Sequence, residues 1–349
     1  MVAPTAPSLL YQRSIQVILA GQDLRGGYIA CPSYATYRYV WARDGAFIAE
    51  AMRAAGRADS AGAFHRFISR AVLALADADG AAPALLPARF EIDGTLDASD
   101  WPNFQTDGYG LWLWALRRHA EAGGLEPDAE RAARVAAAYL ATRWSDPCHD
   151  PWEEGGDRLP VATLAASVAG LRAAGVLLGH GPWRAAADEA WRLLLDRGVA
   201  DGRLLKDVGV PGGVDSACLW ALRPLDLFAP DHPVYAGTVA AVERRLMVPN
   251  VHRHPDDVYY GGGAWPILSA LWGLCRLGGG DECGARQALD WIATTAGSSG
   301  DLPEQVPEPM LHPEGLAAWQ AERGPVATPL LWSHAMYVTL SLRLAAAGA

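Results

Sequence analysis

The sequence has no uninterrupted apolar run long enough to cross a membrane and no basic run that would follow a phosphate backbone. Its 349 residues hold 39 acidic against 29 basic side chains, which gives a net charge of −10. Nucleic acid and anionic membranes are therefore not expected as partners. The opening residues, Met1 to Ser8, lack a basic region followed by an apolar stretch, so no secretion signal is expected.

Cysteine and phenylalanine are both scarce. The cysteines are odd in number, widely scattered and without a CxxC pair: Cys31, Cys148, Cys218, Cys275 and Cys283. We interpret them as reduced thiols of a cytoplasmic protein, without disulfide or zinc roles. Fourteen tryptophans and eleven tyrosines stand beside only six phenylalanines. Rings with a flat apolar face and a polar edge are used by carbohydrate sites, although protein cores use them too.

Helical periodicity dominates the chain and strand-like alternation is rare, which predicts an all-α protein. No linker, low-complexity tract or composition shift divides the sequence, so a single domain over residues 1–349 is expected. The expected helices span residues 8–20, 43–55, 59–77, 106–122, 127–143, 160–176, 182–197, 215–225, 234–246, 261–278, 284–297 and 328–347.

The connections between these helices alternate in length. Those after the second, fourth, sixth, eighth and tenth helices are short, whereas those after the odd-numbered helices are long. Short links join antiparallel neighbours, so all long loops would emerge at one end of the assembly. Six hairpins closed into a ring form an (α/α)6 barrel, with its long loops over one mouth.

One long loop contains Asp150-Pro151-Trp152-Glu153-Glu154. Desolvation beside an apolar ring raises a carboxyl pKa, so one of these glutamates could stay protonated and donate its proton to a leaving oxygen. The alternative is that the two acids occupy the first turn of the following helix, where the helix dipole favours negative charge.

Other long loops carry polar and aromatic residues together. Arg43 and Asp44 could grip vicinal hydroxyls or could form a structural pair at a helix start. Asp107 could bind a ligand or cap its helix. His254, Asp256 and Asp257 lack the ligand spacing of a known metal site, and so do Asp93, Asp97 and Asp100. His334 is more simply a core residue.

Six segments taken together resemble the glucoamylase family, glycoside hydrolase family 15, in order and spacing. They are Tyr37 to Asp44, Trp101 to Asp107, Trp152-Glu153-Glu154, Arg253 to Trp265, Leu302 to Gln305 and Trp332-Ser333-His334-Ala335. The resemblance covers essentially the whole chain. It implies an (α/α)6 barrel and inverting exo-hydrolysis of α-glucosidic bonds from a non-reducing end, with release of β-glucose.

The resemblance also implies roles for individual residues. Glu153 would be the general acid, Glu304 the general base that activates water, and Glu154 a ligand of the sugar beyond the cleaved bond. Arg43 and Asp44 would hold the 4- and 6-hydroxyls of the terminal glucose. The other substrate-binding positions that it implies are Tyr37, Trp41, Trp101, Gln105, Asp107, Trp152, Arg253, Asp257, Tyr259 and Trp332.

An inverting hydrolase needs one protonated carboxyl and one carboxylate roughly 6.5 to 9.5 Å apart. Glu153 and Glu304 lie on different long loops, which the ring would bring to opposite sides of one mouth. No metal or organic cofactor is then required, because two carboxyls supply all the proton transfer. A phosphorylase is less well matched, because phosphorolysis needs no base such as Glu304. A non-catalytic sugar-binding protein would tolerate loss of either carboxylate.

Many larger relatives carry a β-sandwich before the barrel or a starch-binding module, and neither is expected in this sequence. We therefore expect small oligosaccharide substrates already inside the cell, with glucose as product, and a monomeric protein. Isomaltose and short isomalto-oligosaccharides are the first expectation, maltose-type α-1,4 substrates the second and trehalose the third. The glycines Gly261 to Gly263 differ from the more polar turn expected in glucoamylases, which leaves the preference for the leaving sugar open.

Overall fold

The computed structural model describes residues 8–77, 80–307 and 309–348. The predictions for Met1 to Pro7, and the two ends of the expected single domain, lie outside the described residues. That the chain is one domain stays a prediction.

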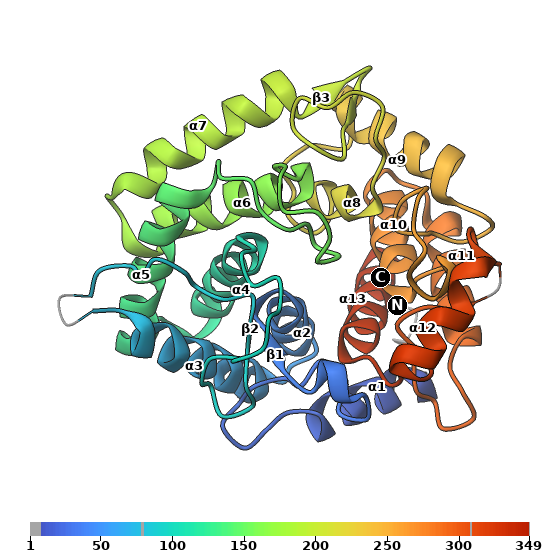
Figure 1. The fold of residues 1–349 in the computed structure, drawn as a ribbon, viewed down its shortest axis with the longest axis horizontal. Helices are drawn as coiled ribbons and strands as arrows, with labels where there is room; N and C mark the ends of the chain where they lie inside the picture. Colours follow the sequence, from blue (N-terminus) through green and yellow to red (C-terminus); the bar gives the residue numbers. More distant parts are fainter. Residues whose placement is uncertain (1–7, 78–79, 308, 349) are drawn as a thin grey trace.

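The helices form two concentric rings around a central axis (Figure 1). Each inner helix contacts the next inner helix, and α13 contacts α2, so the inner ring is closed. The inner helices are α2 (Ala42–Ala54), α4 (Asp107–Gly123), α6 (Val161–Leu178), α8 (Leu219–Leu222), α10 (Pro266–Gly278) and α13 (Leu331–Ala347). The outer helices are α1 (Leu9–Ala20), α3 (Ala58–Leu75), α5 (Pro127–Arg143), α7 (Pro182–Arg197), α9 (Pro233–Leu246) and α11 (Glu282–Thr294). The predicted (α/α)6 barrel is therefore confirmed.

Helix α6 is apolar on all sides because it packs against both inner and outer helices. Helix α6 is long and apolar enough to pass a length-and-composition test for a membrane span, with a mean hydropathy of 1.8. However, 83% of that helix is buried within the protein, as expected of a core helix. Glycines allow it to approach α4 closely. A Cβ atom on Gly170 would lie 2.5 Å from the Cα of Gly110.

Four of the five expected short links join their helices through a few residues. The link between α8 and α9 is longer, from residue 223 to residue 232. Helix α8 is also shorter than expected, because Pro224 forces the preceding Arg223 into an extended conformation. The expected helix at 215–225 is therefore a 3₁₀ turn, η2 (Ser216–Cys218), followed by α8.

Two expected helix starts were too early. Helix α10 begins at Pro266 rather than residue 261, because Gly261 and Gly262 have φ values of 81° and 66° and therefore break the helical path. Helix α13 begins at Leu331 rather than residue 328, after Pro329. Pro at the first helical position is a start signal that the sequence offered for α10.

The prediction missed one helix and several short elements in the long loops. They are α12 (Leu316–Arg323), the 3₁₀ turns η1 (Ala35–Tyr37), η3 (Tyr259–Gly261) and η4 (Pro313–Gly315), and the strands β1 (Val40–Trp41), β2 (Arg89–Phe90), β3 (Val199–Ala200) and β4 (Arg203–Leu204). Strands β1 and β2 pair antiparallel, with Trp41 opposite Arg89. This pairing ties the first long loop to the loop that follows α3.

Candidate active site

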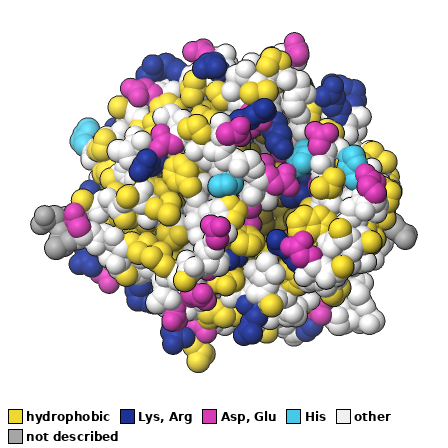
Figure 2. Space-filling model, in the orientation of Figure 1, with side chains coloured by type: hydrophobic (Ala, Val, Ile, Leu, Met, Phe, Trp, Pro, Cys, Tyr) yellow, Lys and Arg dark blue, Asp and Glu magenta, His cyan; other side chains and the backbone are white. Residues whose placement is uncertain are grey.

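A cavity of about 340 Å³ opens among the long loops. Residues from five of the six loops, together with the first turns of α2 and α13, line it. The sixth loop, between α7 and α8, does not line the cavity but supports its wall from behind. Figure 2 shows a depression near the centre of this face, where acidic and basic side chains gather among hydrophobic ones.

Arg43 is one of the buried charged residues of the cavity wall. Its Nη1 atom donates to Gln105 Oε1 at 2.7 Å and to Asp107 Oδ2 at 3.1 Å, and its Nε lies 3.6 Å from Asp44 Oδ1. Burial raises the pKa of Asp44 to about 7 despite the Arg43 charge. The predicted pair is thus both structural and exposed to the cavity, since Arg43 and Asp44 line it while Gln105 and Asp107 hold Arg43 from behind.

Asp107 does not act as the helix N-cap that the sequence allowed as an alternative. Thr106 is the N-cap residue of α4, and Asp107 is the first residue of the helix. Its Oδ1 accepts from the Gly108 backbone N–H at 2.8 Å, while Oδ2 faces Arg43. Its buried carboxylate therefore orients the guanidinium.

Glu153 receives several donors on one carboxyl oxygen. Its Oε1 accepts from Trp41 Nε1 at 2.7 Å, from Gln105 Nε2 at 3.4 Å and from Arg43 Nη2 at 3.5 Å. The ring that reaches this carboxyl belongs to Trp41, which presents its N–H to it. Within the described residues Oε2 has no hydrogen-bond partner, so it is the oxygen free to exchange a proton with a ligand.

Glu153 and Glu154 lie in a tight turn and not in the first turn of α6, which starts at Val161. The helix-dipole alternative is therefore wrong. Glu153 has a φ of 69°, an unfavourable backbone conformation for a non-glycine residue. Asp150 stabilises the turn, because its Oδ1 accepts from the backbone N–H groups of Trp152 at 3.0 Å and Glu154 at 2.9 Å.

The loop between α7 and α8 holds this turn from outside the cavity. Trp152 Nε1 donates to Asp215 Oδ2 at 2.9 Å. Lys206 Nζ lies 3.6 Å from Asp150 and 3.7 Å from Asp215. Burial, together with the Asp215 charge, raises the pKa of Asp150 to about 6 despite Lys206. The sequence gave no signal that these residues meet.

Arg253 organises the wall beside Glu154. Its guanidinium bonds Asp257 through two nitrogens and reaches Glu154 Oε1 at 3.1 Å. His254 Nε2 lies 3.0 Å from Glu154 Oε2. Although burial alone would raise it, the pKa of Glu154 falls to about 2 because of the His254 hydrogen bond and the Arg253 charge. Ligand atoms of Glu154, His254 and Asp257 lie within 4.8 Å of one another, but the positive charge between the two carboxylates is already supplied by Arg253.

Glu304 also lines the cavity and is 3% exposed. Burial raises its pKa to about 8, while the Tyr37 hydroxyl and the Arg253 charge act in the opposite direction. Tyr37 and Tyr259 share a hydrogen bond of 2.7 Å between their hydroxyls. Glu304 Oε2 is buried and has no hydrogen-bond partner among the described residues, so it can accept a proton from a small ligand such as water.

Several other polar atoms of the cavity wall are buried without a partner in the described part of the chain. They are the indole nitrogens of Trp101, Trp265 and Trp332 and the Nε atom of Arg43. A buried donor without an acceptor costs free energy unless a ligand or water satisfies it. Aromatic faces with unpaired donors and acceptors suit a ligand rich in hydroxyl groups.

The structure brings all but three of the residues predicted from the sequence to the cavity wall. The exceptions are Gln105, Asp107 and Asp257, which hold Arg43 and Arg253 from behind. The prediction missed Trp265, Trp319 and Arg323, which also line the cavity. His334 is a fully buried core residue, as expected, and accepts from the Leu302 N–H at 2.9 Å.

Comparisons with known proteins agree with this arrangement. The family model described as glycosyl hydrolases family 15 matches residues 6–299. The chain is 43% identical to the isomaltose glucohydrolase of Kribbella flavida over 95% of this chain and 91% of that protein. A glycosidase variant solved in complex with glucose superposes with a TM-score of 0.89 at 42% identity, over 96% of each chain. A bacterial glucoamylase complexed with acarbose shares the fold, with a TM-score of 0.78 at 22% identity over 97% of this chain and 55% of that one.

Proposed function

Because this chain belongs to glycosyl hydrolase family 15, we propose that it removes glucose from the non-reducing end of small α-glucosides with inversion, and that isomaltose is its preferred substrate. The observation that carries this proposal is the cavity that holds Glu153 and Glu304 together beside the buried Arg43–Asp44 pair. A cavity closed by a charged pair accepts a chain end and excludes the middle of a polymer. The relative that is 43% identical is an isomaltose glucohydrolase, which supports the α-1,6 preference.

In the proposed mechanism Arg43 and Asp44 hold the hydroxyls of the terminal glucose. Glu153 donates a proton from its free Oε2 to the glycosidic oxygen. Glu304, in its ionised form, accepts a proton from a water molecule that attacks the anomeric carbon from the opposite face. The Tyr37 hydroxyl lies beside the region where positive charge develops on the sugar ring. The product is β-glucose.

Each carboxyl must hold the right protonation state during this reaction. Glu304 has a pKa of about 8 in the free protein, so binding of donors such as water has to favour its ionised form. Its unpartnered Oε2 is the atom at which such a donor would act.

The cellular location and the assembly state are also part of the proposal. We place the protein in the cytoplasm, which is supported by five cysteines that are all free thiols, four of them buried. We further propose that it acts as a monomer, in which Glu153 and Glu304 line the same cavity.

Proton NMR of freshly released glucose tests the proposal. The purified protein is incubated separately with isomaltose, maltose and trehalose, and the first anomer is recorded before mutarotation. We expect β-glucose first, and fastest from isomaltose. Faster release from maltose or trehalose would mean that the preferred linkage is not α-1,6. If α-glucose were the first anomer released, the roles of Glu153 and Glu304 would be contradicted. No release from any of them would favour a non-catalytic sugar-binding protein.

A further inference from the structure

Helix α12 differs from the other helices that the structure describes, because none of its residues is buried. It contacts η3 and η4 and lies toward the right of the ring in Figure 1, and two of its residues, Trp319 and Arg323, line the cavity. Two backbone hydrogen bonds anchor the segment before it, from Leu311 N to Gly262 O at 3.2 Å and from His312 N to Gly261 O at 2.9 Å. At its end, the Tyr260 hydroxyl donates to Gly324 O at 2.9 Å.

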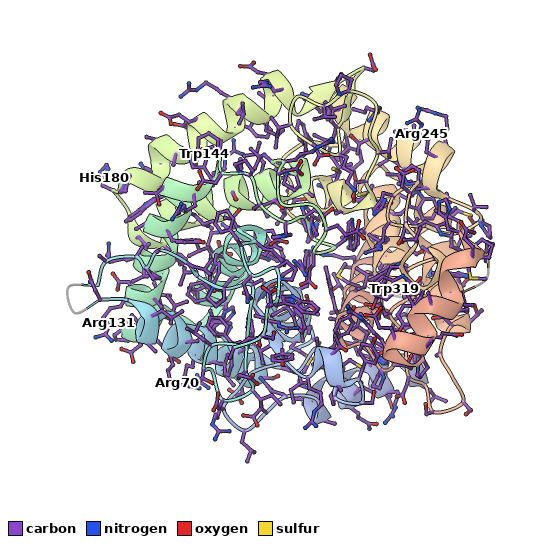
Figure 3. The ribbon with its side chains drawn as sticks, in the orientation of Figure 1. Arg70, Arg131, Trp144, His180, Arg245 and Trp319 are labelled. Atoms are coloured by element: carbon purple, nitrogen blue, oxygen red, sulfur yellow. The ribbon has the colours of Figure 1, made fainter. Side chains whose placement is uncertain are left out.

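Between these anchors, Trp319 makes the main side-chain contact of α12 with the barrel. Its ring lies edge-on to Tyr259 with 4.9 Å between centroids, and stacks on Tyr260 at 6.3 Å. Figure 3 labels Trp319 on this helix. The side chain is only partly buried and lines the cavity. Leu316 of the same helix also packs against the hydrophobic core, and both side chains stay partly exposed, so α12 adds little to the core itself.

Arg323 lines the cavity from the same face of the helix, because it follows Trp319 by four residues. Its Cζ atom lies 5.0 Å from the Trp319 ring centroid. The Nε atom donates to Glu322 at 3.2 Å, and no hydrogen bond from either Nη atom is found within the described residues. The guanidinium therefore presents unused donors beside an aromatic face at the cavity wall.

This pair lies on the exposed side of the cavity. A series of contacts separates it from Arg43, since Trp41 packs on Tyr37 at 5.7 Å, Tyr37 bonds Tyr259 and Tyr259 packs on Trp319. The Arg43 side chain is 6% exposed, whereas that of Arg323 is 27% exposed. A glucose bound at Arg43 therefore has its leaving group directed toward the mouth, where Trp319 and Arg323 lie.

We infer that Trp319 and Arg323 bind the leaving sugar and thereby determine which glucosides are cleaved efficiently. This inference rests on the proposed function. The indole face packs against the C–H face of the leaving glucose, and the guanidinium donates to two of its neighbouring hydroxyls. A leaving glucose linked through its C6 atom has one more rotatable bond than a 4-linked one. Its productive orientation therefore depends more on contacts outside the cleaved bond.

The test compares isomaltose with α-glucosyl fluoride, whose leaving group is not a sugar. Trp319→Ala and Arg323→Met are measured beside Gln320→Ala, an exposed residue of the same helix that does not line the cavity. We expect each variant of the pair to lose about tenfold or more in kcat/KM on isomaltose, mainly through KM. Hydrolysis of the fluoride should stay within about twofold of the unmodified protein, and Gln320→Ala should retain both activities.

Two outcomes would overturn the inference. Equal losses on both substrates would mean that α12 acts through Tyr259 and Tyr37 on Glu304, and unchanged activity on both would mean that the pair has no role. Trp319→Phe guards against local unfolding, because it keeps an aromatic ring against Tyr259. If the unmodified protein hydrolysed neither substrate, the proposed function would fail first and the inference would fall with it.

Discussion

At the scale of single residues, Glu153 and Glu304 differ in the groups that reach their carboxyls. Glu153 Oε1 is surrounded by donors from Trp41, Gln105 and Arg43. Glu304 is buried and keeps one oxygen without a partner in the described part of the chain. These surroundings suit different tasks, and substitutions of the two residues should have different consequences.

Glu153→Gln should lower turnover of isomaltose by about a hundredfold or more, because the glycosidic oxygen then leaves without a proton. Its activity on α-glucosyl fluoride should fall much less, since fluoride leaves without protonation. Glu304→Gln should lose activity on both substrates, because both need an activated water. Initial rates on the two substrates measure this. A Glu304→Gln protein that still cleaved the fluoride well would contradict the role of Glu304.

The same Glu304→Gln substitution should stabilise the fold above neutral pH. A carboxyl with a pKa of about 8 in the folded state keeps a proton that the unfolded chain has lost above about pH 4.5. Stability therefore falls as the pH rises from about 4.5 to 8. Glutamine does not titrate, so the variant should gain on the order of a few kcal/mol at pH 8 and little at pH 5. Urea unfolding at both pH values measures this, and equal gains would contradict the buried-acid explanation.

The sequence motifs identified which residues belong to the cavity, but they did not show which of them line it and which lie behind its wall. Trp41 and Arg43 belong to one short segment, yet the sequence does not say that the Trp41 N–H turns toward Glu153. Asp107 and Asp257 lie behind arginines because the backbone places them one layer deeper, which residue spacing does not reveal. Asp215 was missed because its contact with Trp152 joins two loops that are far apart in the sequence.

At the scale of helices and loops, glycines set how closely α4 and α6 approach. Gly170 has no space for a side chain, because the nearest atoms are backbone atoms of Gly110. Gly175 lies on the same helix but would place a Cβ against the flexible Arg184 side chain at 3.4 Å. The two positions therefore provide a matched pair of substitutions.

Gly170→Ala should destabilise the protein by about 1–3 kcal/mol, because the two helices must separate. Gly175→Ala should be neutral or stabilise it by up to about 1 kcal/mol, since alanine favours a helix more than glycine does. Thermal and urea unfolding of both variants test this. Similar changes in stability at the two positions would contradict the role of the helix crossing, because helix propensity alone should act equally at both.

The long helices were predictable because their apolar periodicity extends over several turns. The loops were less so. Helix α12 has only eight residues, so its apolar pattern extends over little more than two turns and is hard to recognise. The start of α10 was placed too early because Gly261 to Gly263 continue an apolar segment, although the backbone at Gly261 and Gly262 has positive φ.

At the scale of the whole molecule, the alternation of short and long connections predicted the closed ring, because antiparallel hairpins can bury their faces only by closing on one another. The alternation does not specify how the first helix, α1, contacts the last, α13. His334 on α13 forms part of that contact, which is called the α1–α13 joint below. Its Nδ1 lies 2.9 Å from Ser14 Oγ on α1, and its Nε2 accepts from Leu302 N–H in the loop that carries Glu304.

His334 should make the closure of the ring sensitive to acid. Burial lowers its pKa to about 3, so between about pH 6.5 and 3 the unfolded chain binds a proton that the folded protein does not. Stability is therefore lost as the pH falls through this range. His65, buried between α3 and α4, has a lowered pKa as well and contributes in the same direction.

His334→Gln keeps a donor and an acceptor at this joint but removes the titration. From pH 7 to pH 5 the unmodified protein should lose about 2 kcal/mol more unfolding free energy than the variant does. The variant is expected to start from a lower stability at pH 7, because an amide cannot reproduce both imidazole contacts. His65→Gln serves as the comparison, since it removes a buried histidine away from the joint. Urea unfolding monitored by tryptophan fluorescence measures the unfolding free energy at each pH. If His334→Gln and the unmodified protein lost the same unfolding free energy between pH 7 and pH 5, the α1–α13 joint would not be a site of acid sensitivity.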